Sequence, residues 1–502
     1  MARLPRGIEI GPKLGREAGR VLSAEALQFV AELHRGGGTV RELLKANRAE
    51  RQVERDKGGL PDFKPETSAI RCGRWTAAAL PRDLLDLRAG IVTEVSRKPL
   101  LAGLNCGARL CLADLSEFTS PAWDRLIDGQ GNLMDRWTSA MEHVDKATGR
   151  RISLSQRLAT LMVQPRSIMA DEPRVKCDGT PIAAGLFDAG LYLFHNAKVA
   201  LAKASGPYLQ LIDVASQHEA RAWNDILLQA QSLLGLPTGS IRVHLRIDSL
   251  AAAFEMDEII HELREHAAGM SPGGQRYGFD IIRSFAAQKA RIIGGDGPPD
   301  GALRDLVIRT AHRRGLLALA PMSRSDARAQ AEQAVRSGFD GMWTSHPEHV
   351  AAALKVFDGD MPTANQIYVS RDEVTVGASE ILETGKDARS EIRVRQNIDA
   401  ALLVLEAWLG GGGGLSVDGA IEDLASADFR RAQLWQWLRH GVKLDGTKKF
   451  NAGMFEAHLA QGLNELKSRD GRFKEAATLL KALVTATDLP PDIFALAWKK
   501  LP

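Results

Sequence analysis

Residues 208–248 read "YLQLIDVASQHEARAWNDILLQAQSLLGLPTGSIRVHLRID", and this stretch decides the fold. It begins with a short apolar run, "YLQLIDV" (208–214), and continues through residues 215–234 with apolar side chains at helical spacing. It ends with a second apolar run, "IRVHLRID" (241–248). Two short apolar runs separated by an amphipathic segment predict a parallel β–α–β unit.

The same alternation extends to both sides of this stretch. Further apolar runs of strand length lie at residues 99–105, 109–115, 159–166, 315–322 and 339–346. A weaker candidate, "HAAGMS" (266–271), completes a set of eight. Repeated β–α units over such a length predict an α/β fold in which the parallel sheet closes as a TIM (β/α)₈ barrel.

Polar residues follow the predicted strands at their carboxyl ends, where barrel enzymes carry out their chemistry. They are Asp114, Arg166, Asp213, Asp248, Ser323 and His346. Arg276 follows the weak strand and is expected on the same face. The sequence therefore predicts a site at this end of the barrel.

The two flanks of the barrel are predicted to be helical. Residues 23–35 and 39–57 have helical patterns, and the second is too polar for a core, so it either clasps another domain or lies on the surface. The run Gly410–Gly414 is either a plain linker or a hinge that lets the next helix swing over the barrel mouth. We expect an N-terminal helical clasp (1–97), a barrel (98–355) and a C-terminal helical plug (356–502).

Composition limits the classes of partner. The chain has 502 residues and a net charge of +3 without a basic stripe, which argues against nucleic acid or an anionic membrane as a partner. No stretch approaches the ~18 apolar residues of a membrane span, and the N-terminus has no apolar signal core. The 4 cysteines lack CxxC spacing, which is typical of reduced thiols. We expect a cytoplasmic protein that acts on small molecules, and the sequence assigns no oligomeric state.

Several longer stretches resemble the malate synthase family, in its shorter A-type branch. They include "GLPDFKPETSAIR" (59–71), "FEMDEIIHELREH" (254–266), "GFDGMWTSHP" (338–347) and "GAIEDLASADFRRAQLWQWLRH" (419–440). The resemblance implies a clasp, a TIM barrel and a plug. It also implies condensation of acetyl-CoA with glyoxylate, followed by hydrolysis of the thioester to malate and CoA, with Mg²⁺ at the site.

Asp423 matches the aspartate with which the family removes a proton from the acetyl methyl group. A methyl group beside a thioester is a very weak acid, so this chemistry needs a positioned base and strong stabilisation of charge. The alternative interpretation of Asp423 is a carboxylate that stabilises the N-terminus of a helix.

The other half of the site departs from the family pattern. The family has two arginines in an R-x-R-G strand end, and here that segment reads Gln164-Pro165-Arg166-Ser167. Gln164 therefore stands where the resemblance places the catalytic arginine, and Arg166 matches only the second one. We expect both residues at the catalytic centre, together with Asp423 and Arg276.

The acids that the family uses around its metal are also changed. Asp114 keeps the first acid of the family's ADFEDS segment, but Ser116 replaces the second. Asp248 replaces a metal-binding glutamate, and Arg276 stands where the family has a metal-binding aspartate. The residues that we expect to bind substrate are Asp114, Asp213, Asp248, Met322 and His346.

Arg276 has two interpretations. It is either a surface residue paired with Asp280, four positions on, or a cation that replaces Mg²⁺ and is held by Asp248. The second interpretation predicts that the protein needs no divalent metal and that Asp248 is its one candidate ligand.

Three functions remain open at this point. The first is condensation of acetyl-CoA, or another acyl-CoA, with glyoxylate or another 2-oxo acid. The second is metal-independent cleavage or hydrolysis of a 3-hydroxyacyl-CoA. The third is binding of a metabolite without catalysis.

Overall fold

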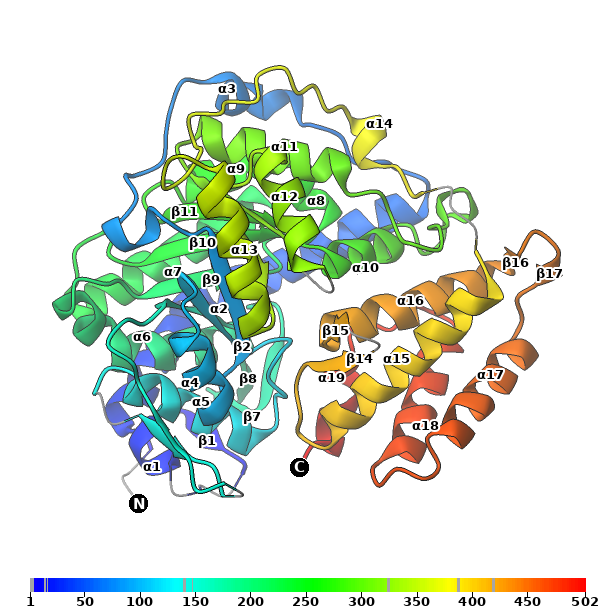
Figure 1. Ribbon diagram of the computed structural model, residues 1–502, viewed down its shortest axis with the longest axis horizontal. Coiled ribbons are helices and arrows are strands. Elements are labelled where there is room, and N and C mark those ends of the chain that lie inside the picture. Colours follow the sequence, from blue (N-terminus) through cyan, green and yellow to red (C-terminus); the bar gives the residue numbers. More distant parts are fainter. Residues whose placement is uncertain are drawn as a thin grey trace.

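The computed structural model describes residues 4–12, 15, 17–138, 141–146, 148–322, 326–385, 389–417 and 420–502. Its centre is a closed barrel of parallel strands in the order β10-β11-β12-β13-β2-β3-β6-β9 (Figure 1). The strands are β2 (Ala89–Glu94), β3 (Leu110–Asp114), β6 (Thr160–Gln164), β9 (Tyr208–Leu211), β10 (Arg242–Ile247), β11 (Ala267–Pro272), β12 (Leu317–Ala320) and β13 (Gly341–Thr344). The predicted TIM barrel is confirmed.

One of the predicted strands is wrong. Residues 99–105 lie in helix α4 (Arg97–Asn105), whose apolar face buries Leu100, Leu101 and Leu104. The first barrel strand is β2, which lies on the N-terminal side of the boundary that we placed at residue 98. The weak candidate at 266–271 is a barrel strand, β11.

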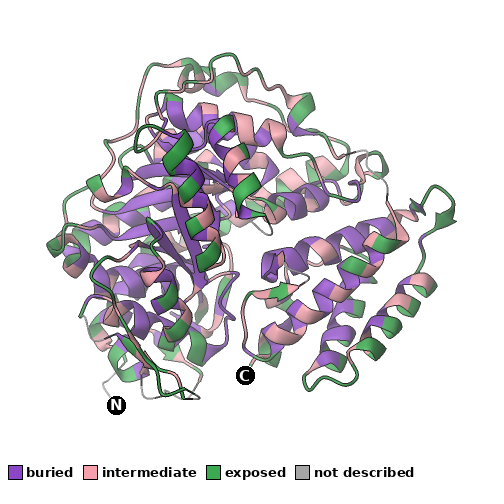
Figure 2. Cartoon of the chain, in the orientation of Figure 1, coloured by how far each residue is buried: buried purple, intermediate pink, exposed green. Residues whose placement is uncertain are grey.

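Helices cover the outside of the barrel. They are α5 (Trp123–Asp135), α6 (Ala184–Ala202), α7 (Gln217–Leu234), α8 (Leu250–Phe254), α9 (Met256–Glu262), α10 (Gln275–Ser284), α11 (Gly301–Arg313), α12 (Ala327–Ser337) and α13 (Pro347–Asp360), together with α4. The strands are buried between these helices and the barrel interior, as Figure 2 shows. Because both faces of β11 are buried, apolar and polar residues do not alternate along this strand.

The N-terminal segment wraps around the barrel. The two helical patterns predicted there form one continuous helix, α2 (Ala24–Asp56), which contacts α6 and α7. The shorter elements nearby are α1 (Ala18–Val21), α3 (Ser68–Cys72), the 3₁₀ turns Pro65–Thr67 and Arg82–Leu84, and a sheet of β1 (Ile8–Ile10), β7 (Asp171–Cys177) and β8 (Thr180–Ala183). The polar helix is therefore a clasp on the barrel.

The C-terminal segment has a hydrophobic core of its own. Its helices are α15 (Glu391–Leu409), α16 (Leu424–His440), α17 (Ala452–Glu465), α18 (Phe473–Val484) and α19 (Ile493–Ala497). These helices form a group beside the barrel (Figure 1). One of them, α16, packs against the barrel helix α10. Trp408, Trp435 and Trp437 are buried in this group.

The remaining elements are short. They are the hairpins β4 (Glu142–Val144) with β5 (Arg151–Ser153), β14 (Leu415–Val417) with β15 (Ala420–Glu422), and β16 (Lys443–Leu444) with β17 (Lys448–Lys449), helix α14 (Ala378–Ile381), and the 3₁₀ turns Lys289–Arg291 and Trp498–Lys500. The C-terminal segment is thus mainly helical, with two small hairpins and an irregular stretch at residues 361–377. Among the residues that the structure describes, no helix is both long and apolar enough to cross a bilayer.

Candidate active site at the barrel mouth

A cavity of about 90 Å³ lies at the carboxyl ends of the barrel strands, and we call it the inner cavity. Its polar lining consists of Asp114, Glu117, Gln164, Gln210, Arg246, Ser271, Gln275, Arg276 and Asp423. Asp114 ends β3 and Gln164 ends β6, and the two residues are paired in the register of the sheet. The barrel and α16 of the plug thus close one space together.

Asp423 is the N-cap residue of α16 and is buried. Its Oδ1 accepts a hydrogen bond from the backbone N–H of Ser426 at 2.8 Å, and the Ser426 hydroxyl accepts one from the Asp423 N–H at 2.8 Å. The neighbouring Leu424 N–H lies 3.5 Å from the carbonyl oxygen of Glu117 in the barrel. Asp423 therefore caps a helix, as its alternative interpretation predicted, and also lines the inner cavity.

Two arginines share one carboxylate on the wall of the inner cavity, and we call Arg246 and Arg276 the guanidinium pair. Arg246 donates from Nη1 and Nη2 to the two oxygens of Glu117, at 2.7 Å each. Arg276 donates from Nε to Glu117 at 3.1 Å and from Nη1 to Asp428 of α16 at 3.2 Å. Burial favours a raised pKa for Glu117, but the two guanidinium groups outweigh it and hold that pKa below its usual range.

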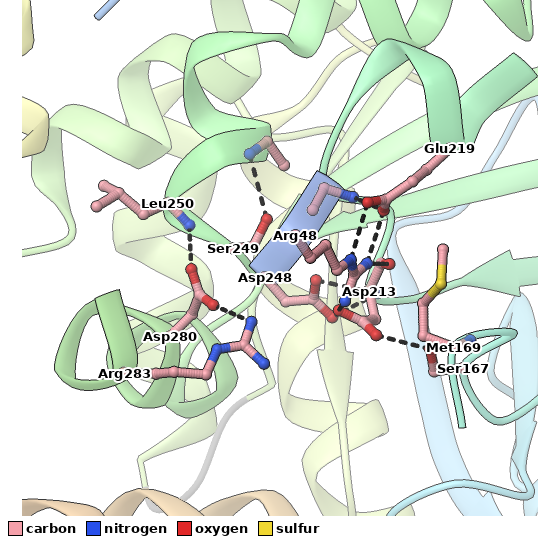
Figure 3. Close-up of polar contacts among 12 residues, drawn as sticks. Arg48, Ser167, Met169, Asp213, Glu219, Asp248, Ser249, Leu250, Asp280 and Arg283 are labelled. Atoms are coloured by element: carbon pink, nitrogen blue, oxygen red, sulfur yellow. Dashed lines mark hydrogen bonds and ion pairs between the residues drawn. The ribbon is translucent and has the colours of Figure 1, made fainter. Parts of the chain in front are cut away.

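The partners predicted for Arg276 are both wrong. Asp248 accepts hydrogen bonds from Arg246 at 3.2 Å and from the backbone N–H of Asp213 at 3.1 Å. Asp280 accepts the Leu250 N–H at 2.7 Å and pairs with Arg283, as Figure 3 shows. Arg276 instead reaches Glu117 and Asp428, because its helix α10 packs against α16.

A second cavity, of about 220 Å³, lies on the other side of Arg276, and we call it the outer cavity. Asp213 and Asp248 line it, with Arg48 of α2 between Asp213 and Glu219 (Figure 3). Arg48 donates to Asp213 at 2.8 Å and to Glu219 at 2.6 Å, and Ser167 donates to Asp213 at 2.6 Å. Asp213 thus anchors the clasp helix at the edge of this cavity.

Arg166 also lines the outer cavity, but its guanidinium is already engaged. It donates to both oxygens of Asp188 at 2.8 Å and to Glu172 at 2.8 Å, and all three residues are buried. Among the described residues, Arg166 lines the outer cavity but not the inner one that holds Gln164 and Asp423.

Asp114 is buried at the base of the inner cavity. Its carboxylate accepts backbone hydrogen bonds from Ser116 at 2.6 Å and from Glu117 at 3.0 Å. Burial, followed by the negative charge of Glu117, raises the pKa of Asp114 to about 7. This carboxyl therefore changes its protonation near neutral pH.

The carboxylates at the barrel mouth are already engaged within the protein. Mg²⁺ requires several oxygen ligands in near-octahedral geometry, whereas Asp114, Glu117 and Asp248 already accept hydrogen bonds from backbone N–H groups or arginines. Within the described ranges, no group of three or more His, Cys, Asp or Glu residues is arranged to hold a metal ion. Burial raises the pKa of Asp248 to about 6.

A groove of about 580 Å³ adjoins the inner cavity, and we call it the side groove. The two spaces share Gly274, Gln275, Pro321 and Met322 as walls, so Met322 lies where the sequence predicted a substrate contact. His346 lines none of the three spaces and precedes α13, with its ring packed edge-on against His349. Ser323 lies outside the described residues.

Sequence reasoning missed Glu117, Gln210 and Arg246. The resemblance places an acid at position 116, where this chain has Ser116. The acid that reaches the site is Glu117, one position further along the chain. Arg242, His244 and Arg246 alternate along β10, and polar residues with a period of two in a barrel strand indicate a polar interior face. That alternation was the signal that could have identified Arg246.

Comparisons with known proteins agree along the chain. Family models described as the malate synthase N-terminal domain, TIM barrel domain and C-terminal region match residues 8–69, 160–384 and 388–501. A malate synthase of Myxococcus xanthus is 37% identical over 482 residues, covering 92% of this chain and 89% of the relative. Malate synthase A of Escherichia coli is 32% identical over 504 residues, covering 95% and 94%.

A solved structure of Haloferax volcanii malate synthase, in a pyruvate and acetyl-CoA ternary complex, is 14% identical with a TM-score of 0.48. It covers 78% of this chain and 98% of the solved chain. The family models together match more than half of the sequence, and the curated relatives align over most of both chains. The chain belongs to the malate synthase family.

Proposed function

We propose that this protein joins the acyl group of an acyl-CoA thioester to a 2-oxo acid and then hydrolyses the thioester, without a divalent metal. Asp423 is the base, and the guanidinium pair supplies the positive charge. The observation that carries the proposal is that Asp423, Arg246 and Arg276 line the same cavity at the barrel mouth.

The reaction needs a base and a cation at the same place. Asp423 takes a proton from the carbon next to the thioester, and the resulting enolate attacks the carbonyl carbon of the 2-oxo acid. Water then cleaves the thioester, so that acyl-CoA, 2-oxo acid and water give a 2-hydroxy diacid and CoA. Charge that develops on oxygen in these steps is stabilised most strongly by fixed donors in a site that excludes water.

Arg276 is suited to hold the carboxylate of the acceptor. Its Nε and Nη1 carry the ion pairs to Glu117 and Asp428, and within the described chain Nη2 remains available to a ligand. A hydrogen bond from a charged guanidinium N–H to a carboxylate is stronger than one between neutral groups.

Arg276 and a divalent ion exclude one another. A guanidinium about 4 Å from a divalent ion is repelled by roughly 8 kcal/mol at an effective dielectric constant of about 20. The guanidinium is fixed in place by Glu117 and Asp428, so it cannot move away without breaking two ion pairs.

The side groove gives the acyl-CoA a route to the base. It is the largest of the three spaces, at about 580 Å³, and it shares the walls Gln275, Pro321 and Met322 with the inner cavity. A thioester arm that enters along this groove brings its acyl carbon to the inner cavity.

The test is release of thiol from acetyl-CoA across a panel of 2-oxo acids, with exchange of the acetyl hydrogens for deuterium as a second readout. Release that depends on a 2-oxo acid, with exchange, supports condensation. Release from a preformed 3-hydroxyacyl-CoA alone assigns the cleavage or hydrolysis activity instead. A folded protein that does neither is a binding protein, and the proposal is then wrong.

A further inference from the structure

Two neighbouring glutamines meet at the base of the inner cavity. Gln164 ends β6, and Gln210 lies in β9, the adjacent strand of the barrel. Gln210 Nε2 donates a hydrogen bond to Gln164 Oε1 at 2.6 Å. Gln164 is 0% exposed and Gln210 is 3% exposed, so water has little access to their amides.

Each amide keeps one polar atom that the protein does not satisfy. Gln164 Nε2 and Gln210 Oε1 are buried and make no hydrogen bond to any residue that the structure describes. Both side chains line the inner cavity, beside Asp423 and the guanidinium pair. Buried amide atoms are nearly always hydrogen-bonded, so these two adjacent atoms in a cavity wall are suited to bind a group that supplies both partners.

The chemistry of that ligand does not depend on which way the amides face. Turning both amide groups over makes Gln164 the donor of the shared hydrogen bond and Gln210 its acceptor. The pair then still presents one N–H donor and one carbonyl acceptor to the cavity. A matching ligand group must therefore accept one hydrogen bond and donate another.

We propose that the acceptor substrate is a 2-oxo acid that carries a hydroxyl group on its carbon chain, and that this hydroxyl binds between Gln164 and Gln210. This inference rests on the proposed function. A hydroxyl both accepts and donates, whereas a carboxylate only accepts and a methyl group does neither. The volume of the cavity, about 90 Å³, is small compared with that of the side groove, about 580 Å³, which suits a small acid.

The two ends of such a substrate meet different walls. Its carboxylate faces the guanidinium pair, where Arg276 has a donor available, and its hydroxyl faces the neutral amides. Gln164 stands where the family pattern has an arginine, so this wall has exchanged a charged donor for a neutral amide.

The test compares 3-hydroxypyruvate with 2-oxobutyrate as acceptors for acetyl-CoA. The two acids have the same number of non-hydrogen atoms and differ only by hydroxyl against methyl. We expect kcat/KM to favour 3-hydroxypyruvate by at least about 10²-fold, because a site built to bind a hydroxyl strongly rejects an analogue without one. Thiol release with no preference between them would overturn this inference while the proposed function stands.

Substitutions of the two glutamines test whether they cause the preference for 3-hydroxypyruvate. Gln164→Leu and Gln210→Leu should each reduce it to less than about tenfold, since one partner of the hydroxyl is removed. Gln231→Leu is the matched control, because Gln231 is a buried amide with an unsatisfied Nε2 that lines none of the three spaces. If both glutamine variants kept the full preference for 3-hydroxypyruvate over 2-oxobutyrate, the hydroxyl would not bind between Gln164 and Gln210. If neither variant folds, the test rests on the ratio of kcat/KM for the two acids in the unaltered protein.

Binding separates this inference from the proposed function. If acetyl-CoA releases no thiol with any acceptor, the proposed function fails, and calorimetric titration with the two acids becomes the readout. Tighter binding of 3-hydroxypyruvate that is lost in Gln210→Leu keeps the assignment of the hydroxyl site. Equal affinity for the two acids overturns it.

Discussion

At the scale of single residues, the carboxylate of Asp423 caps a helix and is also the base that we propose. One oxygen accepts the Ser426 N–H and so caps α16, while the side chain lines the cavity in which we place the reaction. The cap fixes the direction of the carboxylate, because the hydrogen bond to the helix N-terminus leaves the side chain little freedom. If Asp423 is the base, as we propose, the cap positions it before substrate binds.

Asp423→Asn separates the two functions, since asparagine is as good an N-cap as aspartate but cannot act as the base. We expect turnover to fall by roughly 10² or more, with little change in melting temperature and intact acyl-CoA binding. Asp326→Asn is the control, because Asp326 caps α12 in the same way, with Oδ1 3.0 Å from the Ala329 N–H. Near-normal turnover in Asp423→Asn would remove this residue from the mechanism.

The pKa of Asp114 makes stability depend on pH in a defined direction. Its folded-state pKa is about 7 against an ordinary value of 3.8, so the unfolded chain loses this proton first. The contribution of this group to stability is present below pH ~4 and is lost as pH rises to ~7, at up to about 1.4 kcal/mol per unit. Asp248, with a folded-state pKa of about 6, acts in the same direction.

Asp114→Asn should therefore gain stability relative to the unaltered protein as pH rises from 5 to 7. Asparagine keeps an oxygen for the backbone N–H groups of Ser116 and Glu117, but it has no charge to desolvate. Urea unfolding at pH 5, 6, 7 and 8 measures the difference between the two proteins. Parallel stability curves across this range would contradict the assignment.

Much of the site could be predicted at this scale, but its pairing could not. Asp114 and Arg276, which were expected at strand ends, line one cavity with Gln164, Met322 and Asp423, which were expected from the resemblance. Three other expected residues line the outer cavity instead, namely Arg166, Asp213 and Asp248. The partners of Arg276 were wrong because they depend on how α10 packs on α16, and sequence spacing contains no information about that contact.

At the scale of elements, the glycine run after α15 is packed against the barrel. A Cβ on Gly413 would lie 1.6 Å from the carbonyl oxygen of Phe118, and the Gly414 N–H donates to the same oxygen at 3.3 Å. Phe118 follows Glu117, which binds both arginines. The run therefore connects the plug to the loop that holds the guanidinium pair, and the hinge remains a prediction.

Alanine substitutions test this contact. Gly413→Ala must displace the loop at Phe118, so we expect turnover to fall severalfold or more, with a smaller proportional loss of stability. Gly410→Ala is the matched control, because its Cβ would lie 3.4 Å from the nearest atom, in ordinary contact. Equal activity and melting temperature in the two variants would mean that the run is a passive linker.

The strands show where pattern reasoning is reliable. Long repeated β–α units predicted the barrel correctly, whereas the short run 99–105 was wrongly taken as a strand. A short apolar segment fits a buried strand or one face of a helix equally well, and only packing decides between them. Strand β2 was missed because it lies within residues 1–97, which were expected to form the helical clasp.

At the scale of the whole molecule, the site depends on parts that are far apart in the chain. Asp423 and Asp428 come from the plug, Arg246 and Arg276 from the barrel, and Arg48 of the clasp holds Asp213 at the outer cavity. The order of clasp, barrel and plug could be predicted from composition and resemblance, while the boundaries at residues 97/98 and 355/356 remain predictions.

The central claim is that a fixed guanidinium takes the place of a divalent ion. The most direct measurement is thiol release from acetyl-CoA with the best 2-oxo acid, in EDTA and then with added Mg²⁺, for the unaltered protein and for Arg276→Ala. We expect full activity in EDTA, no gain from Mg²⁺, and loss of activity in Arg276→Ala. Activity that is lost in EDTA and restored by Mg²⁺ would contradict the account.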